Sequence, residues 1–192
     1  MEELKLIPPL QIPPESFPES EELSEGVKTV KWKDTFGYDV EFLPDEIYAN
    51  RDGINLHLKV LIPRTMEESD RQWPLIVFVQ GSAWHRQDLY CHLPALLRMS
   101  QRGYAIAIVE YRPSDIVPFP AQVQDTKTAI RFLRINASRY RIDPQHVALW
   151  GDSSGGHTAL MTGFTGDDAP DMDAYREQSA AVNCIVDWYG PT

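Results

Sequence analysis

The pattern of apolar and polar residues divides the chain into two regions. Residues 27–32 and 56–62 alternate between apolar and polar, and a short apolar stretch at 46–49 precedes the turn signal Asp52-Gly53. Later in the chain the apolar stretches are continuous instead, at 75–79, 105–109 and 147–150. Alternation predicts strands with one solvated face, whereas continuous apolar runs predict strands that are buried on both faces of a parallel sheet.

Helical patterns separate the continuous apolar runs. Apolar residues at helical spacing predict helices at 92–101, 120–137 and 153–163, and a last strand is predicted at 181–188. Regular alternation of strands and helices is typical of a parallel sheet with helices on both faces. We therefore predict an α/β fold with a mostly parallel, doubly wound sheet that begins with antiparallel strands.

Composition then sets the domain organisation. A chain of 192 residues, of which 43% are hydrophobic, is enough for one domain with its own core. Residues 1–26 differ from the rest because they are rich in proline and glutamate, and such a stretch buries little apolar surface. We predict an irregular acidic arm at 1–26 and a single domain at 27–192.

Charge and residue content exclude several functions. The formal net charge of −10 disfavours nucleic acids and anionic membranes as partners, because both need a basic surface. No apolar run reaches the roughly 20 residues of a membrane span, and the start lacks a signal peptide, so we predict a cytoplasmic protein. Cys91 and Cys184 are predicted to be free thiols, and no motif for a metal or another cofactor is found, so none is predicted.

The segment 151–155 (Gly-Asp-Ser-Ser-Gly) carries the strongest chemical signal. It has the form G-x-S-x-G, it follows an apolar strand, and it precedes a helical pattern, which is the context of a nucleophile elbow. A sharp turn there would lift Ser153 clear of the sheet, and the N-terminal N–H groups of the next helix would favour developing negative charge. We predict Ser153 as the nucleophile and the backbone N–H of Ser154 as an oxyanion-hole donor.

A second motif, residues 80–84 (Gln-Gly-Ser-Ala-Trp), directly follows the strand predicted at 75–79. The loop after this strand supplies the other oxyanion donors when a nucleophile elbow is present. Small residues let the backbone approach a substrate carbonyl oxygen closely. We therefore predict that the N–H groups of Ser82 and Ala83 serve as donors.

These motifs resemble those of the esterase and lipase branch of the α/β-hydrolase fold. The chain is most similar to its carbohydrate-esterase-like group, which includes feruloyl and acetyl esterases, and the similarity extends from about residue 56 to residue 192. The matching segments are 74–78, 81–84, 102–104, 110–112, 119–122 with Asp125, 142–144, 151–157 and 188–191. The resemblance implies a serine esterase that cleaves small-molecule carboxylic esters through an acyl-serine.

The oxyanion loop departs from the family pattern. Family members usually have His-Gly-Gly, where this chain has Gln80-Gly81-Ser82. Gln80 can still brace the loop through hydrogen bonds, and we expect the side chain of Ser82 to narrow the pocket. Around that pocket, Trp84 and Phe119 are candidate walls for an acyl or aryl group, and His85 is a candidate lining residue.

The catalytic base and acid are not evident. A serine needs a histidine to take its proton and an acid to orient that histidine, in the chain order Ser, acid, His. The histidine that follows Ser153 is His157, four residues along the same predicted helix, where it reads as a packing residue. The resemblance implies an Asp and a His beyond Thr192, so we expect this sequence to be the N-terminal part of a longer hydrolase.

Two other functions remain open at this stage. A serine peptidase of the prolyl-oligopeptidase type shares the fold and the elbow, although the chain lacks the large N-terminal propeller of that type. A degenerate, non-catalytic hydrolase module is the alternative suggested by the missing acid and base.

Overall fold

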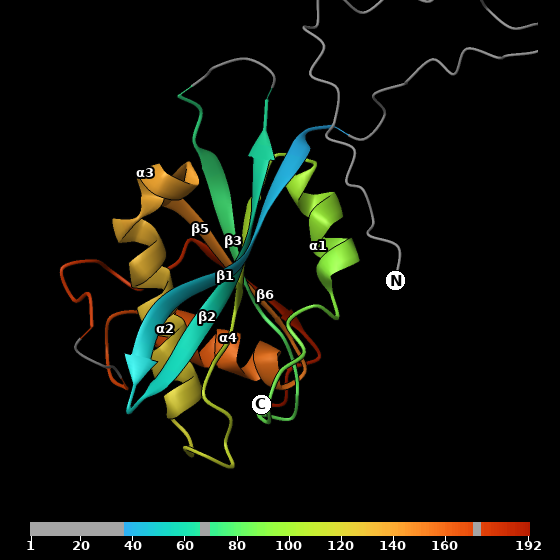
Figure 1. Cartoon of the computed structure of the whole chain (residues 1–192). Coiled ribbons are helices and arrows are strands. Elements are labelled where there is room, and N and C mark those ends of the chain that lie inside the picture. Colours follow the sequence, from blue (N-terminus) through green and yellow to red (C-terminus); the bar gives the residue numbers. More distant parts are fainter. Residues whose placement is uncertain (1–36, 66–69, 171–173) are drawn as a thin grey trace, which may run out of the picture. The chain divides into compact units, whose positions relative to one another are not determined.

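A computed structural model describes residues 37–65, 70–170 and 174–192 (Figure 1). The acidic arm at 1–26 and the strand at 27–32 lie outside the described residues, so both stay predictions. Within the described part of the chain, no helix is long and apolar enough to span a membrane.

The sheet has six strands in the order β1-β2-β4-β3-β5-β6. Strands β1 and β2 run antiparallel to each other, and β2 also pairs antiparallel with β4, whereas β4, β3, β5 and β6 are parallel neighbours. The strand bounds are Asp39–Arg51 (β1), Ile54–Arg64 (β2), Trp73–Val79 (β3), Ala105–Val109 (β4), Ile142–Asp152 (β5) and Cys184–Trp188 (β6). This mixed sheet confirms the predicted α/β fold with antiparallel strands at its beginning.

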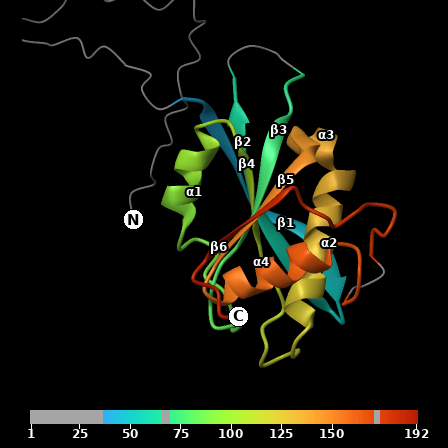
Figure 2. The same cartoon turned by 180° about the vertical axis from the view of Figure 1, so that it is seen from behind.

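The helices cover both faces of the sheet. Their bounds are Leu93–Ser100 (α1), Ala121–Ile135 (α2), Ala137–Tyr140 (α3) and Ser154–Thr165 (α4). Helix α1 lies on one side, and α2, α3 and α4 lie on the other (Figures 1 and 2). For this reason β3 and β4 are buried on both faces: every residue of β4 is buried, and so is every residue of β3 except the partly buried Pro74.

The strand order reverses at β3, and this reversal defines a crevice beyond the carboxyl ends of the central strands. From β3 the chain moves through α1 to β4 on one side, and it then returns through α2 to β5 on the other side of β3. Ligands of open α/β sheets bind at such a reversal, beyond the carboxyl ends of the strands. Residues 80–85 follow β3 and Ser153 follows β5, so both predicted motifs lie at this point.

A buried ion pair anchors the loop that follows β4. The carboxylate of Asp125 on α2 is fully buried and accepts hydrogen bonds from the Arg112 guanidinium and from the Arg112 backbone N–H, at 2.8 to 3.2 Å. Gln122, also on α2, donates to the carbonyls of Arg112 and Val117. The first half of α2 therefore holds residues 112–117 in place beside the crevice.

Candidate active site

Ser153 lies at the tip of a sharp turn between β5 and α4. Its φ and ψ are 49° and −126°, a region that residues other than glycine rarely occupy, and the residue is exposed. The Ser153 N–H donates to the carbonyl of Trp188 at 2.8 Å, and its carbonyl accepts the first hydrogen bond of α4 from the His157 N–H at 3.1 Å. This geometry is the sharp strand-to-helix turn, the elbow, that the sequence predicts.

Close packing explains the glycines around the elbow. A Cβ atom on Gly155 would come within 2.0 Å of the Val79 carbonyl oxygen, and one on Gly151 within 2.2 Å of the Gly155 carbonyl oxygen. A Cβ atom on Gly81 would lie 2.4 Å from the Asp152 carbonyl oxygen. The elbow and the loop after β3 therefore touch through their backbones.

The side chain of Asp152, just before Ser153, supports the loop after β3. Asp152 is almost fully buried, and its Oδ1 accepts the Gly81 N–H at 2.9 Å. Its Oδ2 lies 3.5 Å from Nε2 of His92, the residue that precedes α1. The sequence reasoning missed this role, although the position of Asp152 beside the nucleophile was a usable signal.

The three predicted oxyanion donors differ in how they are bonded. The Ser82 N–H donates to the Ser154 hydroxyl oxygen at 2.9 Å, so it is already occupied. The N–H groups of Ala83 and Ser154 have no acceptor within the described part of the chain. Ala83 and Ser154 therefore offer free amides, and the Ser82 amide can join them only after it leaves the Ser154 hydroxyl.

The loop also carries backbone strain. Ala83 and Trp84 both have positive φ angles, 52° and 60°. Such conformations cost of order 1 kcal/mol or more for residues with a Cβ atom, and they persist where surrounding contacts hold them. Here the contacts include the Trp84 N–H, which donates to the Ser154 hydroxyl oxygen at 3.2 Å, and the Trp84 carbonyl, which accepts the Ser114 N–H at 2.8 Å.

An apolar cavity of about 380 Å³ opens beside the elbow. Trp84 and Phe119, both predicted as pocket walls, line it together with three residues that the sequence did not single out for the pocket, Ser114, Gln122 and His157. The His157 ring packs edge-on against the Trp84 ring, with centroids 5.3 Å apart, which agrees with the packing role predicted for it.

The remaining predicted pocket residue, His85, lies outside the lining of this cavity. Its side chain is about two-thirds exposed, and its Nδ1 lies 3.8 Å from Asp115 Oδ1. Its backbone carbonyl accepts a 2.6 Å hydrogen bond from the Ser82 hydroxyl, so His85 contributes to the loop through its main chain.

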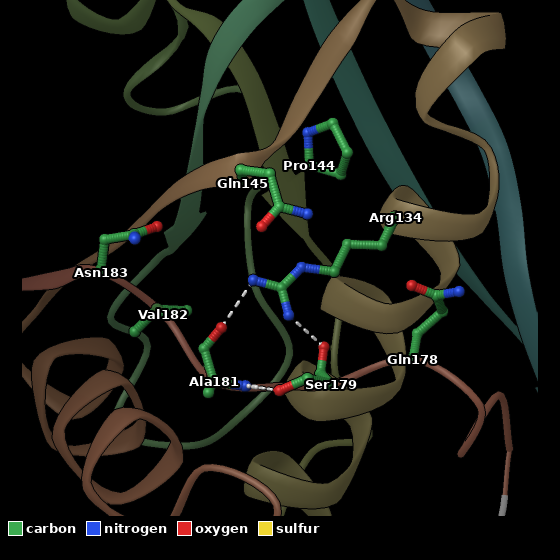
Figure 3. A pocket seen from close by; sticks show the side chains of 8 residues that line it. All are labelled: Arg134, Pro144, Gln145, Gln178, Ser179, Ala181, Val182 and Asn183. Atoms are coloured by element: carbon green, nitrogen blue, oxygen red, sulfur yellow. Dashed lines mark hydrogen bonds between the residues drawn. The ribbon is translucent and has the colours of Figure 1, made fainter.

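A second cavity, of about 410 Å³, shares no lining residue with the first, and Figure 3 shows the side chains that line it. It is lined by Pro144 and Gln145 at the start of β5, by Arg134 on α2, and by the chain that leads into β6. The Arg134 guanidinium donates to the carbonyls of Ser179 and Ala181. Because this cavity lies at the amino ends of the strands, it is not where ligands of such sheets bind, and we do not treat it as the active site.

Comparison with known proteins settles the family. The sequence signature of the BD-FAE family matches residues 59–192. The chain belongs to the BD-FAE family. Its six-stranded mixed sheet and its similarity to esterases of known structure show that this BD-FAE protein has the α/β-hydrolase fold.

Individual relatives of the BD-FAE chain include a sequence and two structures. Esterase LipC of Mycobacterium tuberculosis is 30% identical over 119 residues, which cover 61% of this chain and 30% of LipC. A truncated form of a carbohydrate esterase from gut microbiota has a TM-score of 0.68 and 28% identity, over 84% of this chain and 60% of the other.

The second structure is esterase 2 of Thermogutta terrifontis, phosphonylated by cyclosarin. It has a TM-score of 0.63 and 28% identity, over 78% of this chain and 55% of the other. The BD-FAE chain thus spans 30% of the length of LipC and between half and two-thirds of the length of these two solved structures. The activity of the whole protein is therefore a proposal.

Proposed function

We propose that this BD-FAE protein hydrolyses carboxylic esters of small molecules through an acyl-serine intermediate on Ser153. One observation carries the proposal: an exposed serine hydroxyl on a strained strand-to-helix turn, next to a loop that offers a free backbone amide. The phosphonylated esterase of similar structure supports it, because organophosphonates modify nucleophilic hydroxyls.

The chemistry follows from the arrangement of the elbow and the loop. The Ser153 Oγ attacks the ester carbonyl carbon while its proton passes to a base, and the carbonyl oxygen becomes an oxyanion. The Ala83 and Ser154 N–H groups donate to that oxyanion, and each such donor is typically worth about 3 kcal/mol of barrier lowering. Collapse expels the alcohol, which takes the proton, and water then hydrolyses the acyl-serine by the same steps.

The base and its orienting acid complete this proposal. No histidine among the described residues is hydrogen-bonded to the Ser153 hydroxyl: His157 packs on Trp84, His92 faces Asp152, and His85 faces Asp115. We therefore assign the base to none of these histidines, and propose that the whole protein supplies an acid and then a His after Ser153, in the chain order that the fold uses.

Trapping of the intermediate tests the proposal directly. The intact protein, incubated with a fluorophosphonate, is expected to gain one adduct, and peptide mapping is expected to place it on Ser153. An adduct on another residue, or ester turnover without any adduct, would contradict the acyl-serine mechanism. A comparison of an aryl ester with the matching aryl amide then separates an esterase from a serine peptidase.

The apolar cavity predicts a preference for esters with an apolar group. Phe119 is half exposed at the cavity and shares its lining with Trp84, so Phe119→Ala removes apolar surface that a bound acyl or aryl group would cover. We expect KM for p-nitrophenyl butyrate to rise about tenfold, since the lost contact is worth roughly 1 to 2 kcal/mol, with a smaller rise for the acetate.

Phe164 provides the matched control for this variant. It is a phenylalanine on α4, 80% exposed and outside the lining of the cavity. Steady-state kinetics of Phe164→Ala should match those of the wild type. Equal changes in the two variants, or an unchanged KM in Phe119→Ala, would remove the cavity from the substrate site.

A further inference from the structure

The two residues that flank the nucleophile both hold the loop after β3. On one side of Ser153, the Asp152 carboxylate accepts the Gly81 N–H at 2.9 Å. On the other side, the Ser154 hydroxyl oxygen accepts two N–H groups, from Ser82 at 2.9 Å and from Trp84 at 3.2 Å. Consecutive parts of the loop are thus bonded to the immediate neighbours of the reacting residue.

The burial of Ser154 matters for the two hydrogen bonds that its hydroxyl oxygen accepts from the loop. Ser154 is 1% exposed, and the hydrogen bonds that its hydroxyl oxygen accepts from the two amides are partly buried. An amide that is shielded from water and loses its acceptor is left unsatisfied, which costs more than exchanging one partner for water. The Ser154 hydroxyl oxygen is therefore the acceptor on which both amides depend.

Further hydroxyl groups extend this anchor. The Ser82 hydroxyl donates its one proton to the His85 carbonyl at 2.6 Å, so the Tyr111 hydroxyl, 3.0 Å away, must donate to Ser82. Burial raises the pKa of Tyr111. Ser154, Tyr111 and Ser82 thus form a connected polar network beneath the loop.

The amide between the two held ones remains free. Because Ser82 and Trp84 both donate to Ser154, the Ala83 N–H is fixed between them and has no acceptor within the described residues. The positive φ angles of Ala83 and Trp84 need such support, since neither residue is a glycine. The hydroxyl therefore determines where the Ala83 amide is held relative to Ser153.

We propose that the Ser154 side chain is a positioning residue for the oxyanion hole, which fixes the Ala83 amide by holding the amides of Ser82 and Trp84. This inference rests on the proposed esterase function and adds a second role to Ser154, whose own backbone N–H is a donor. It also assigns the Ser82 amide to the support of the loop, so the hole consists of the Ala83 and Ser154 amides.

Ser154→Ala tests the proposal, because it removes the hydroxyl and keeps the backbone N–H. Hydrogen exchange of the Ser82 and Trp84 amides, followed by NMR, should accelerate about tenfold or more in this variant. The Gly81 amide, bonded to Asp152, is the internal reference and should not change. Thr162→Val is the matched control, since Thr162 is a buried residue of the same helix whose hydroxyl has no partner in the described part of the chain.

Kinetics of the same variants give the second measurement. We expect kcat for p-nitrophenyl acetate to fall about tenfold to thirtyfold in Ser154→Ala, with KM changed less than about threefold, because the loss falls on the transition state. Unchanged exchange at Ser82 and Trp84, or faster exchange with an unchanged kcat, would overturn the proposal. Absence of wild-type turnover would instead refute the esterase function, and the exchange rates would still decide whether Ser154 holds the loop.

Discussion

Replacement of Ser153 by alanine is expected to lower kcat/KM for p-nitrophenyl acetate by roughly four to six powers of ten. The variant keeps the elbow and the free amides but has no oxygen to attack the carbonyl carbon. The residual rate would come from the oxyanion donors and substrate binding, which still accelerate attack by water. The measurement is steady-state hydrolysis by the purified intact protein, with fluorophosphonate labelling as the parallel readout.

Two controls keep this result interpretable. Ser138→Ala removes an exposed serine hydroxyl on α3, away from the elbow, and should retain full activity. Thermal unfolding of Ser153→Ala should match that of the wild type, because its exposed hydroxyl has no partner within the described residues. Activity of Ser153→Ala within tenfold of the wild type would exclude Ser153 as the nucleophile.

Replacement of Asp125 by asparagine is expected to reduce the free energy of unfolding by about 3 to 5 kcal/mol. Asn keeps the shape of the side chain but removes the charge that balances Arg112, whose side chain is only 6% exposed. An uncompensated guanidinium would then remain in the interior, and one of its hydrogen-bond acceptors would become a donor. Urea denaturation at equilibrium measures the change.

Glu41→Gln is the matched control for the charge change. Glu41 pairs with Arg64 at 2.9 Å, but both side chains are substantially exposed, so the loss should be below about 1 kcal/mol. Similar losses in the two variants would show that burial does not govern the energy of the Arg112–Asp125 pair. Because that pair also holds residues 112–117 beside the cavity, Asp125→Asn should raise KM as well as lower stability.

The fold was predictable where strands are uniformly apolar and less so where polar residues interrupt them. Strand β1 extends over Asp39–Arg51, but only its residues 46–49 were predicted as a strand. Pro44 and Asp45 break the alternation, and the pairing register with β2 shifts at this point to accommodate them. Likewise the strand predicted at 147–150 begins earlier, at Ile142, and Asp143 and Pro144 belong to β5 beside a shift in its pairing with β3.

Helix and strand ends differ from the prediction for local reasons. The helix predicted at 120–137 ends at Ile135, and the separate short helix α3 starts at Ala137 after the turn at Asn136. The last strand was predicted from residue 181 but starts at Cys184, because Asn183 uses its side chain to accept the Val147 N–H. Apolar periodicity does not encode such side-chain hydrogen bonds.

The candidate site was predictable in its backbone plan but not in its side-chain contacts. The glycine spacing around Ser153 and the small residues after β3 were sufficient to predict the elbow and the loop. The hydrogen bond from the Ser82 amide to the Ser154 hydroxyl was not predictable. The sequence alone does not show whether the side chain of Ser154 contacts the loop. The roles of Ser114 and Gln122 in the cavity likewise depend on how residues 112–117 are held.

The hydrogen bond from the Ser153 N–H to the Trp188 carbonyl links Ser153 to β6. Parallel pairing holds β6 against β5 from Ala148 with Cys184 to Asp152 with Trp188. Local opening of this pairing would release the Ser153 amide and relax the positive φ angle that presents the hydroxyl. The fraction of molecules competent to react at any instant therefore equals, at most, the fraction in which β6 is paired with β5.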